Sequence, residues 1–479
     1  MMCRNRKGKK KIAIAITLIL VVLSLSGCGT FFSKELEGTG IGSVPGAEKK
    51  GQTQIAAENS TKGEKHQITL GCIETLVPQL LSAAIVDFNK SNPYYEVVIK
   101  GYDWQEGQQR LEMDLATGRG PDIFDLSMVY VDALVEKGMI VDLSPYLADG
   151  QGLEKEDLVE AVLECNTKEG VLTCVPPRFS LDIMVGKKSV VGERSAWSVE
   201  EFLQCVSENE GLQVARGSYG LPRSDIQNRH SIVRTALYRN LEQFVNCQTG
   251  EINFAQEDFK GLLALAKEFE VAPFDYNAGL GGVQSLVEQE KLLLAYNGIS
   301  SVRDYMTAVA ILGEEVQFIG YPTYDGSSCT GIRNVASYGI NADSRVKDGA
   351  WAFLEYLITY RVAGSWIDEY GFYTHKDMLE EQFADGMEKE YMQGPDGEKV
   401  EKEKYIVNGG AKVYAASQED IQQLREWIES PVFVYGLDSN SVYQIIDEEV
   451  YGYLEGTTDL DGAIELIENR VKLYLEEQK

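Results

Sequence analysis

Histidine is scarce in this sequence, with 3 among 479 residues, and the 8 cysteines include no Cys-x-x-Cys pair. Closely spaced cysteines and histidines are what a structural zinc site needs. The chain also lacks the His-Glu-x-x-His, Gly-x-Ser-x-Gly and Gly-x-x-x-x-Gly-Lys motifs, which mark zinc peptidases, serine hydrolases and phosphate-binding loops. We therefore expect no metal, no cofactor and no catalytic residues. A glycosidase stays open as an alternative, because 74 acidic residues could include a catalytic carboxylate pair.

Positive charge is also in deficit, with 45 Lys and Arg against 74 Asp and Glu and a net charge of −29. Six of the basic residues lie within the first 11 positions, where no acidic residue occurs. A mature chain without residues 1–27 would therefore carry a net charge of −35. Such an acidic surface argues against nucleic acid and against anionic lipid headgroups as partners.

The basic start is followed by the apolar run IAIAITLILVVLSL at residues 12–25 and by Ser26-Gly27-Cys28. A basic segment, a short apolar run and small residues before a cleavage point are typical of a secretory signal. The run is shorter than the roughly 20 residues that a membrane-spanning helix needs, although a retained anchor is the alternative. We expect residues 1–27 to be a signal peptide.

LSGC at the end of this segment resembles the bacterial lipobox, which implies that Cys28 is diacylated and becomes the first mature residue. Two acyl chains give stable membrane anchoring. Residues 28–65 are rich in Gly, Ser, Thr, Lys and Glu, so they bury too little apolar surface to fold and should form a flexible tether. We expect the protein on the outer face of the cytoplasmic membrane, attached only through its lipid.

The remaining residues, 66–479, are too many for one ordinary core and indicate two lobes. Strands and helices alternate at the start of this region: strand 67–73, helix 78–93, strand 94–102, helix 104–120, strand 121–127 and helix 129–140. This alternation predicts an α/β fold with mostly parallel sheets flanked by helices. The last residues, 441–478, read as two helices broken at Gly456, and residues 163–177 read as a hairpin in which Cys165 and Cys174 could form a disulfide.

Several short motifs follow one another along residues 67–479. They are ATGRGPDIFDLS, GMIVDLSPYL, GVLTCVPPRFSLDIMVGKK, SAWSVEEFLQ, FIGYPTYDG, SYGINADSRVKDGAWAFLEYLIT and GFYTHKDMLEE, followed by the C-terminal helix pair. Their order and spacing behind a lipobox resemble the bacterial extracellular solute-binding protein family 1, the sugar-type receptors of ABC importers.

This resemblance implies a two-lobed periplasmic-binding-protein-like fold of type II, with a hinge between the lobes. The motifs place the N-terminal lobe at residues 66–175 and 321–372 and the C-terminal lobe at residues 177–320 and 373–479. The family further implies a monomer that holds a small solute between its lobes, closes by hinge motion and delivers the solute to ABC permease subunits.

Candidate ligand-binding residues of the first lobe follow the predicted strands. Ligands of such sheets bind beyond the carboxyl ends of the strands, and a sugar needs aromatic faces together with planar polar groups that form paired hydrogen bonds. The candidates are Glu74 after the first strand, Asp103 and Trp104 after the second, and Asp125 and Ser127 at the end of the third. Each acid could instead be a solvated loop charge, and Trp104 could be a packing residue.

Candidates of the second lobe and the crossings are Arg178, which follows two prolines, and the Tyr296-Asn297-Gly298 segment, with Arg333 and Tyr338 as weaker choices. The alternatives are a surface ion pair for Arg178 and a simple turn for Asn297-Gly298. We expect Trp197, Trp351 and Trp427 to be structural. The predicted function is a receptor for a mono- or oligosaccharide; the alternatives are a receptor for a peptide, polyamine or polyol phosphate, or a surface glycosidase.

Overall fold

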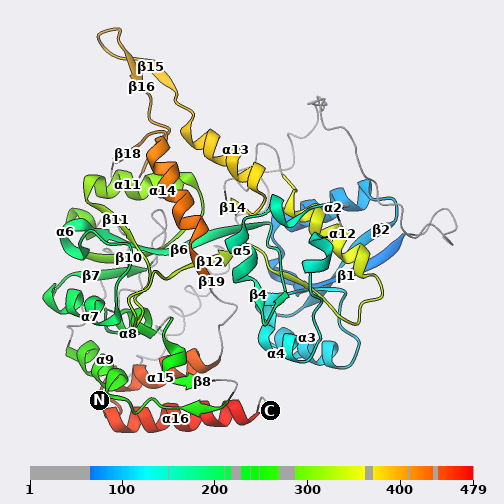
Figure 1. Ribbon diagram of the computed structural model, residues 1–479, viewed down its shortest axis with the longest axis horizontal. Coiled ribbons are helices and arrows are strands. Elements are labelled where there is room, and N and C mark those ends of the chain that lie inside the picture. Colours follow the sequence, from blue (N-terminus) through cyan, green and yellow to red (C-terminus); the bar gives the residue numbers. More distant parts are fainter. Residues whose placement is uncertain are drawn as a thin grey trace, which may run out of the picture. The chain divides into compact units, whose positions relative to one another are not determined.

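Two larger β-sheets organise the part of the chain that the computed structural model describes (Figure 1). This part comprises residues 65–148, 150, 152–209, 211–216, 228–237, 239–246, 249–268, 286–361, 370–407, 410–434 and 441–477. All of them belong to one unit, Ala56–Lys479. The expected signal peptide, Cys28 and the tether up to residue 64 lie outside the described residues.

The first sheet has the strand order β13-β3-β1-β2. Its strands are β1 (His66–Ile73), β2 (Tyr95–Tyr102), β3 (Ile123–Asp125) and β13 (Tyr338–Ile340). β1 pairs in parallel with both β2 and β3, while β13 runs antiparallel to β3. The carboxyl ends of β1, β2 and β3 therefore meet at one edge, as the alternation of strands and helices predicted.

Helices α2 (Gln79–Ser91) and α12 (Lys347–Ile358) cover this sheet and pack against each other (Figure 1). The expected apolar face of α2 is buried at Leu81, Ala84, Ile85 and Phe88. Trp351 of α12 is buried in the same core, as expected. The remaining helices of this half are α3 (Gly107–Ala116), α4 (Val131–Glu136) and α5 (Glu160–Cys165).

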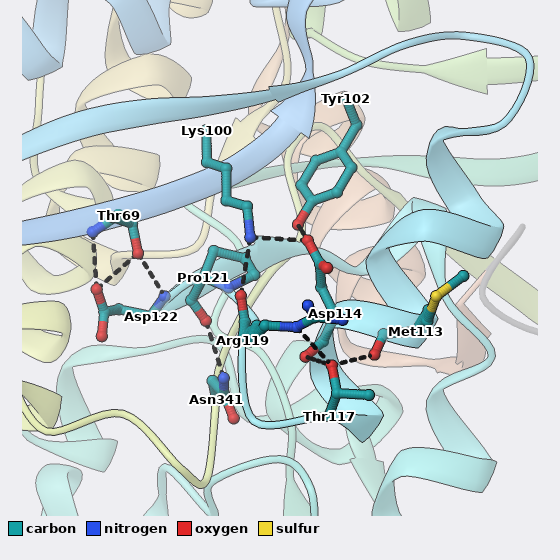
Figure 2. Close-up of polar contacts among 10 residues, drawn as sticks. All are labelled: Thr69, Lys100, Tyr102, Met113, Asp114, Thr117, Arg119, Pro121, Asp122 and Asn341. Atoms are coloured by element: carbon teal, nitrogen blue, oxygen red, sulfur yellow. Dashed lines mark hydrogen bonds and ion pairs between the residues drawn. The ribbon is translucent and has the colours of Figure 1, made fainter.

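Side-chain hydrogen bonds fasten the loop that enters β3 (Figure 2). Asp122 Oδ2 accepts hydrogen bonds from the backbone N and Oγ1 of Thr69 in β1, at 2.8 and 2.7 Å. Its other oxygen accepts one from Ser344 Oγ at 2.7 Å, and Asn341 Nδ2 donates to the Pro121 carbonyl oxygen at 3.0 Å. Pro121 and Asp122 of the ATGRGPDIFDLS segment thus form a clamp that joins β1, the start of β3 and the segment after β13.

The second sheet contains seven of the described strands, in the order β19-β12-β6-β10-β7, with β11 and β14 also paired to β6. β6 is buried along nearly its whole length, including its polar residues Arg178, Ser180 and Asp182. It runs antiparallel to each of its partners, whereas β10 pairs in parallel with β7 and β12 with β19, so this sheet is mixed. The strands are β6 (Arg178–Lys187), β7 (Gln213–Arg216), β10 (Leu292–Ile299), β11 (Val316–Ile319), β12 (Thr330–Asn334), β14 (Phe372–Tyr373) and β19 (Pro431–Val434).

Helices and small hairpins surround the second sheet. The helices are α6 (Lys188–Val191), α7 (Val199–Glu208), α8 (Asn228–Leu237), α9 (Glu257–Glu268), α11 (Val302–Leu312), α13 (Lys376–Met387), α14 (Gln418–Glu429), α15 (Ser441–Leu454) and α16 (Leu460–Glu477). The hairpins pair β8 (Val245–Asn246) with β9 (Glu251–Ile252), β15 (Tyr391–Gln393) with β16 (Lys399–Glu401), and β17 (Tyr405–Ile406) with β18 (Lys412–Val413). Trp197 and Trp427 are buried, as expected.

Strand pairing shows where the chain crosses from one sheet to the other. β12 still pairs with β6, whereas β13 pairs with β3, so the return to the first sheet lies at residues 335–337. This is later than the boundary at residue 321 drawn from sequence, because FIGYP and CTGIRN form strands β11 and β12 of the second sheet. β14 pairs with β6 again, so the chain is back at the second sheet by residue 372.

Two other sequence expectations have clear outcomes. The hairpin forms between β4 (Thr167–Lys168) and β5 (Val171–Leu172), but Cys165 and Cys174 are free thiols, so the disulfide hypothesis is wrong. Cys165 is the last residue of α5 rather than part of a hairpin strand, which takes its side chain out of cross-strand register. The C-terminal helices do separate near Gly456, whose φ of +77° suits glycine.

Candidate functional site

A pocket of about 390 Å³ opens at the carboxyl ends of β1 and β3, next to the crossing that leads into β13. Its lining comes from the end of β1, the turn η1 (Glu74–Leu76), the start of α3, the turn η2 (Leu126–Met128) and the crossing. The lining residues are Cys72, Ile73, Leu76, Val77, Pro78, Trp104, Gln108, Asp125, Ser127, Met128, Asn334, Val335, Ala336, Ser337 and Tyr338. This is the edge of the sheet where ligands of open α/β sheets bind.

Trp104 contributes an exposed aromatic face to this pocket. Its side chain is 70% exposed, so packing does not explain its position. The turn that carries it is held by Asp103, whose Oδ1 accepts hydrogen bonds from the backbone N of Gln105 at 2.9 Å and of Glu106 at 2.8 Å. These bonds lower the pKa of Asp103. Asp103 is therefore a turn-forming residue that supports Trp104 and does not itself line the pocket.

Asp125 is the acidic residue of the pocket wall. Its Oδ1 accepts hydrogen bonds from Ser127 N at 2.9 Å and Ser127 Oγ at 2.7 Å. Among the described residues, no donor contacts its other oxygen, Oδ2. Burial raises the pKa of Asp125, although the bonds from Ser127 oppose this shift. The pocket thus holds a partly desolvated carboxylate with one oxygen available to a ligand.

Two neighbours of this carboxylate remain uncharged near neutral pH. Burial, together with the charges of Asp125 and Glu74, raises the pKa of Cys72 to about 11. Burial and the charge of Asp125 raise the pKa of Tyr338 well above its usual value. Tyr338 of β13 pairs with Asp125 of β3. Two candidate ligand-binding residues from sequence, Tyr338 and Asp125, therefore lie side by side.

The crossing supplies a further polar side chain, Asn334. Its Nδ2 donates to Asn166 Oδ1 at 2.7 Å, and Asn166 is fully buried and also bonded to the carbonyl oxygen of Val162 at 2.8 Å. Asn334 is therefore oriented by the end of α5. Nearby, the carbonyl oxygen of Ser337 accepts a hydrogen bond from Leu126 N at 2.8 Å, which ties the crossing to η2.

The chain matches a known protein family over more than half of its length. The model of that family, described as bacterial extracellular solute-binding protein, matches residues 83–381. This chain belongs to the bacterial extracellular solute-binding proteins. No curated protein sequence matches the chain. The family consists of binding proteins rather than enzymes, in agreement with the sequence-based expectation of a receptor.

Solved structures share the fold of this solute-binding protein. The sugar-binding protein MalE from Xanthomonas citri has a TM-score of 0.51 and 13% identity, covering 86% of this chain and 98% of that chain. A periplasmic oligogalacturonide binding protein from Yersinia enterocolitica has a TM-score of 0.52 and 12% identity, covering 86% and 99%. At such low identity the likeness concerns the fold, and the predicted two-lobed periplasmic-binding-protein-like fold is confirmed.

The solute-binding protein has no apparent metal centre or membrane span in its described part. There, no three His, Cys, Asp or Glu side chains gather as metal ligands would. Likewise, none of the helices in the described ranges is both long and apolar enough to cross a bilayer.

Four of the residues chosen from sequence line the pocket together: Trp104, Asp125, Ser127 and the weaker candidate Tyr338. Glu74 lies just outside, with its side chain directly over Gly101 of β2, where an added Cβ would come within 2.9 Å of it. Glycine at that position gives Glu74 its place beside the strand. Gln108 and Asn334 line the pocket but were missed. Gln108 could have been found from sequence, because it lies at the start of α3, just after Trp104. Asn334 could not, because it lines the pocket only through the crossing at residues 335–337, which sequence placed near residue 321.

Arg178 and Arg333 lie in the second sheet and do not line this pocket. Arg178 is 1% exposed, and its Nη2 donates to the hydroxyl of Tyr373 at 2.7 Å, with its guanidinium 4.4 Å from the ring centre. Arg333 Nη2 lies 3.6 Å from Oδ1 of the buried Asp182. Arg178 therefore packs against Tyr373, and Arg333 forms an ion pair with Asp182 of β6.

Tyr296, Asn297 and Gly298 lie within β10 and pair with Met184, Ile183 and Asp182 of β6. The alternative of a simple turn at Asn297-Gly298 is wrong, since the strand continues to Ile299. The side chains of Tyr296 and Asn297 lie outside the described part, so their role as ligand contacts stays a prediction.

Proposed function

We propose that this solute-binding protein is a carbohydrate receptor of an ABC importer, held at the outer face of the cytoplasmic membrane by a lipid on Cys28. The observation that carries the proposal is the exposed indole of Trp104 in the same pocket as the available oxygen of Asp125. Membership of the solute-binding family supports the further proposal that the solute is delivered to permease subunits.

The chemistry of the pocket suits a sugar ring. A pyranose has apolar C–H faces that pack on an aromatic plane and hydroxyl groups at its edge. Trp104 offers such a plane, while Asp125, Ser127 and Asn334 offer hydrogen-bonding groups around it. Bonds to a charged acceptor such as Asp125 are stronger than bonds between neutral groups. Apolar side chains such as Leu76 and Met128 complete the wall.

The names of two solved structures with this fold also support a carbohydrate ligand. They are named as a sugar-binding protein and an oligogalacturonide binding protein. The lipid anchor rests on the lipobox-like LSGC and the polar tether behind it. A tether of this kind would let a two-lobed receptor move close to a permease.

The test is a ligand screen on the mature chain, residues 28–479, purified without lipid. Thermal shift against mono- and oligosaccharides, followed by calorimetry, should find a sugar that raises the melting temperature and binds with a Kd near micromolar, or about −8 kcal/mol. Product analysis after long incubation checks for hydrolysis. Release of shorter sugars would instead favour the glycosidase, and stabilisation by peptides, polyamines or polyol phosphates alone would refute a carbohydrate receptor.

A further inference from the structure

We infer that the pocket at the carboxyl ends of β1 and β3 selects against negative charge, so that the sugar unit bound there is neutral or amino-substituted and not a uronate or a phosphate. The inference rests on the proposed function, because it narrows the class of carbohydrate that this receptor takes. It goes beyond that function because the fold alone does not fix the charge of the ligand: one protein that shares it is named only as sugar-binding, and another is named for an oligogalacturonide, which is acidic.

The first argument is the charge of the lining. Among the described lining residues, Asp125 is the one acidic side chain, and none is a lysine, arginine or histidine. The groups Cys72 and Tyr338 beside it are neutral, since their pKa values lie far above neutrality. Glu74 adds a second carboxylate close enough to affect Cys72. An anionic substituent would therefore meet negative charge without a compensating cation.

The second argument is that neither of the two cations described near this edge of the first sheet, Lys100 and Arg110, lines the pocket. Lys100 Nζ is bonded to Asp114 Oδ2 and to the carbonyl oxygen of Arg119, both at 2.8 Å (Figure 2). Arg110 of α3 is exposed and lies near Asp103, whose pKa it helps to lower. Neither Lys100 nor Arg110 lines the pocket. Neither can therefore form the charged hydrogen bonds by which arginine usually recognises a carboxylate or phosphate.

The third argument is the geometry of Asp125. Both bonds from Ser127 go to Oδ1, which fixes the carboxylate and leaves Oδ2 for the ligand. A carboxylate oxygen only accepts hydrogen bonds. It therefore suits a sugar hydroxyl or ammonium group, and it repels a uronate in a partly desolvated site, where charge interactions are weakly screened.

The experiment compares charge variants of one sugar at pH 7. The probes are the neutral, uronate and amino forms of glucose and galactose, as monosaccharides and as trisaccharides, measured by calorimetry with the mature chain. We expect each uronate to bind at least tenfold more weakly than its neutral counterpart, and each amino sugar to bind at least as tightly. A uronate that binds as well as the neutral form would overturn the inference, and this comparison on the unmutated chain needs no variant.

The variant Asp125→Asn tests whether the charge of Asp125 causes the preference for neutral sugars over uronates. It keeps an acceptor for Ser127 but removes the charge, and it should reduce the preference for neutral sugar over uronate to about threefold or less. The matched control is Asp142→Asn, because Asp142 Oδ1 accepts the same pair of bonds from Ser144, at 3.0 and 2.8 Å, away from the pocket. An unchanged preference in Asp125→Asn, with Asp142→Asn like the parent, would contradict the role of Asp125.

Failure of the proposed function is distinguishable from failure of this inference. If no sugar binds, the carbohydrate proposal fails, and spermidine and glycerol 3-phosphate then test the charge rule. Binding of spermidine alone would support selection against negative charge, whereas binding of glycerol 3-phosphate would overturn it. A chain that binds none of these probes at millimolar concentration would count against both.

Discussion

Replacing Trp104 by alanine should weaken sugar binding strongly while leaving the folded protein almost as stable as before. The indole is 70% exposed and supports no core, so its removal should change the free energy of unfolding by no more than about 0.5 kcal/mol. Ligand binding is different, because a stacked sugar ring would cover the exposed face of the indole.

The size of the binding effect follows from this exposed area. A tryptophan side chain presents roughly 200 Å², so 70% exposure leaves about 140 Å², of which one face is about 70 Å². At about 25 cal/mol per Å², covering that face contributes about 1.8 kcal/mol. Losing it should raise the Kd about 20-fold. Trp104→Phe keeps a smaller aromatic face and should lose only part of this.

The assay is calorimetry with the best sugar from the screen, together with thermal unfolding of the unliganded proteins. Tyr94→Ala is the matched control, because Tyr94 is 60% exposed and precedes β2 at the opposite end of the strand from Trp104. The control should bind like the parent. If Trp104→Ala also binds within twofold of the parent, the stacking role is refuted. A fall in melting temperature by much more than about 2 °C would instead show that Trp104 is a packing residue.

Three further predictions concern other parts of the chain. Asp122→Ala removes three hydrogen bonds that join β3 to β1 and to Ser344, so denaturant unfolding should show a loss of about 2–4 kcal/mol; a loss below 1 kcal/mol would contradict the clamp. Because burial raises the pKa of Cys72 to about 11, its alkylation should be about 100-fold slower than that of a free cysteine at pH 8 and should speed up about tenfold per pH unit up to that pKa, as peptide mass spectrometry can measure. Cys28→Ser in the expressing cell should move the protein from the membrane fraction to the soluble fraction; unchanged membrane retention would favour an uncleaved signal anchor.

Local sequence patterns predicted the first half of the fold well because the patterns and the contacts agree there. The apolar face of α2 and the strands β1 and β2 each follow from periodicity within a few residues. The rule that ligands bind beyond strand ends also located the edge of the sheet that carries the pocket. These inferences need only neighbours in sequence and the parallel order of strands.

Features that depend on distant segments were not predictable in this way. Arg178 follows two prolines and looked available to ligand, yet its guanidinium is buried against Tyr373, 195 residues later in the chain. Asn297-Gly298 has the composition of a turn, but pairing with β6 keeps it in an extended strand. The return crossing was placed too early because β11 and β12 join the second sheet only through contacts with β6.

The sequence Asp-Leu-Ser occurs twice and shows how location decides the role of identical local chemistry. In Asp125-Leu126-Ser127 and in Asp142-Leu143-Ser144, the serine donates two hydrogen bonds to one aspartate oxygen, and the leucine is buried. Oδ1 of Asp142 accepts a third bond, from Leu172 N at 3.0 Å, which ties it to the β4–β5 hairpin. Asp125 ends β3 and faces the pocket instead. The same turn therefore joins two segments of the first lobe in one place, and in the other it holds a carboxylate where a solute can reach it.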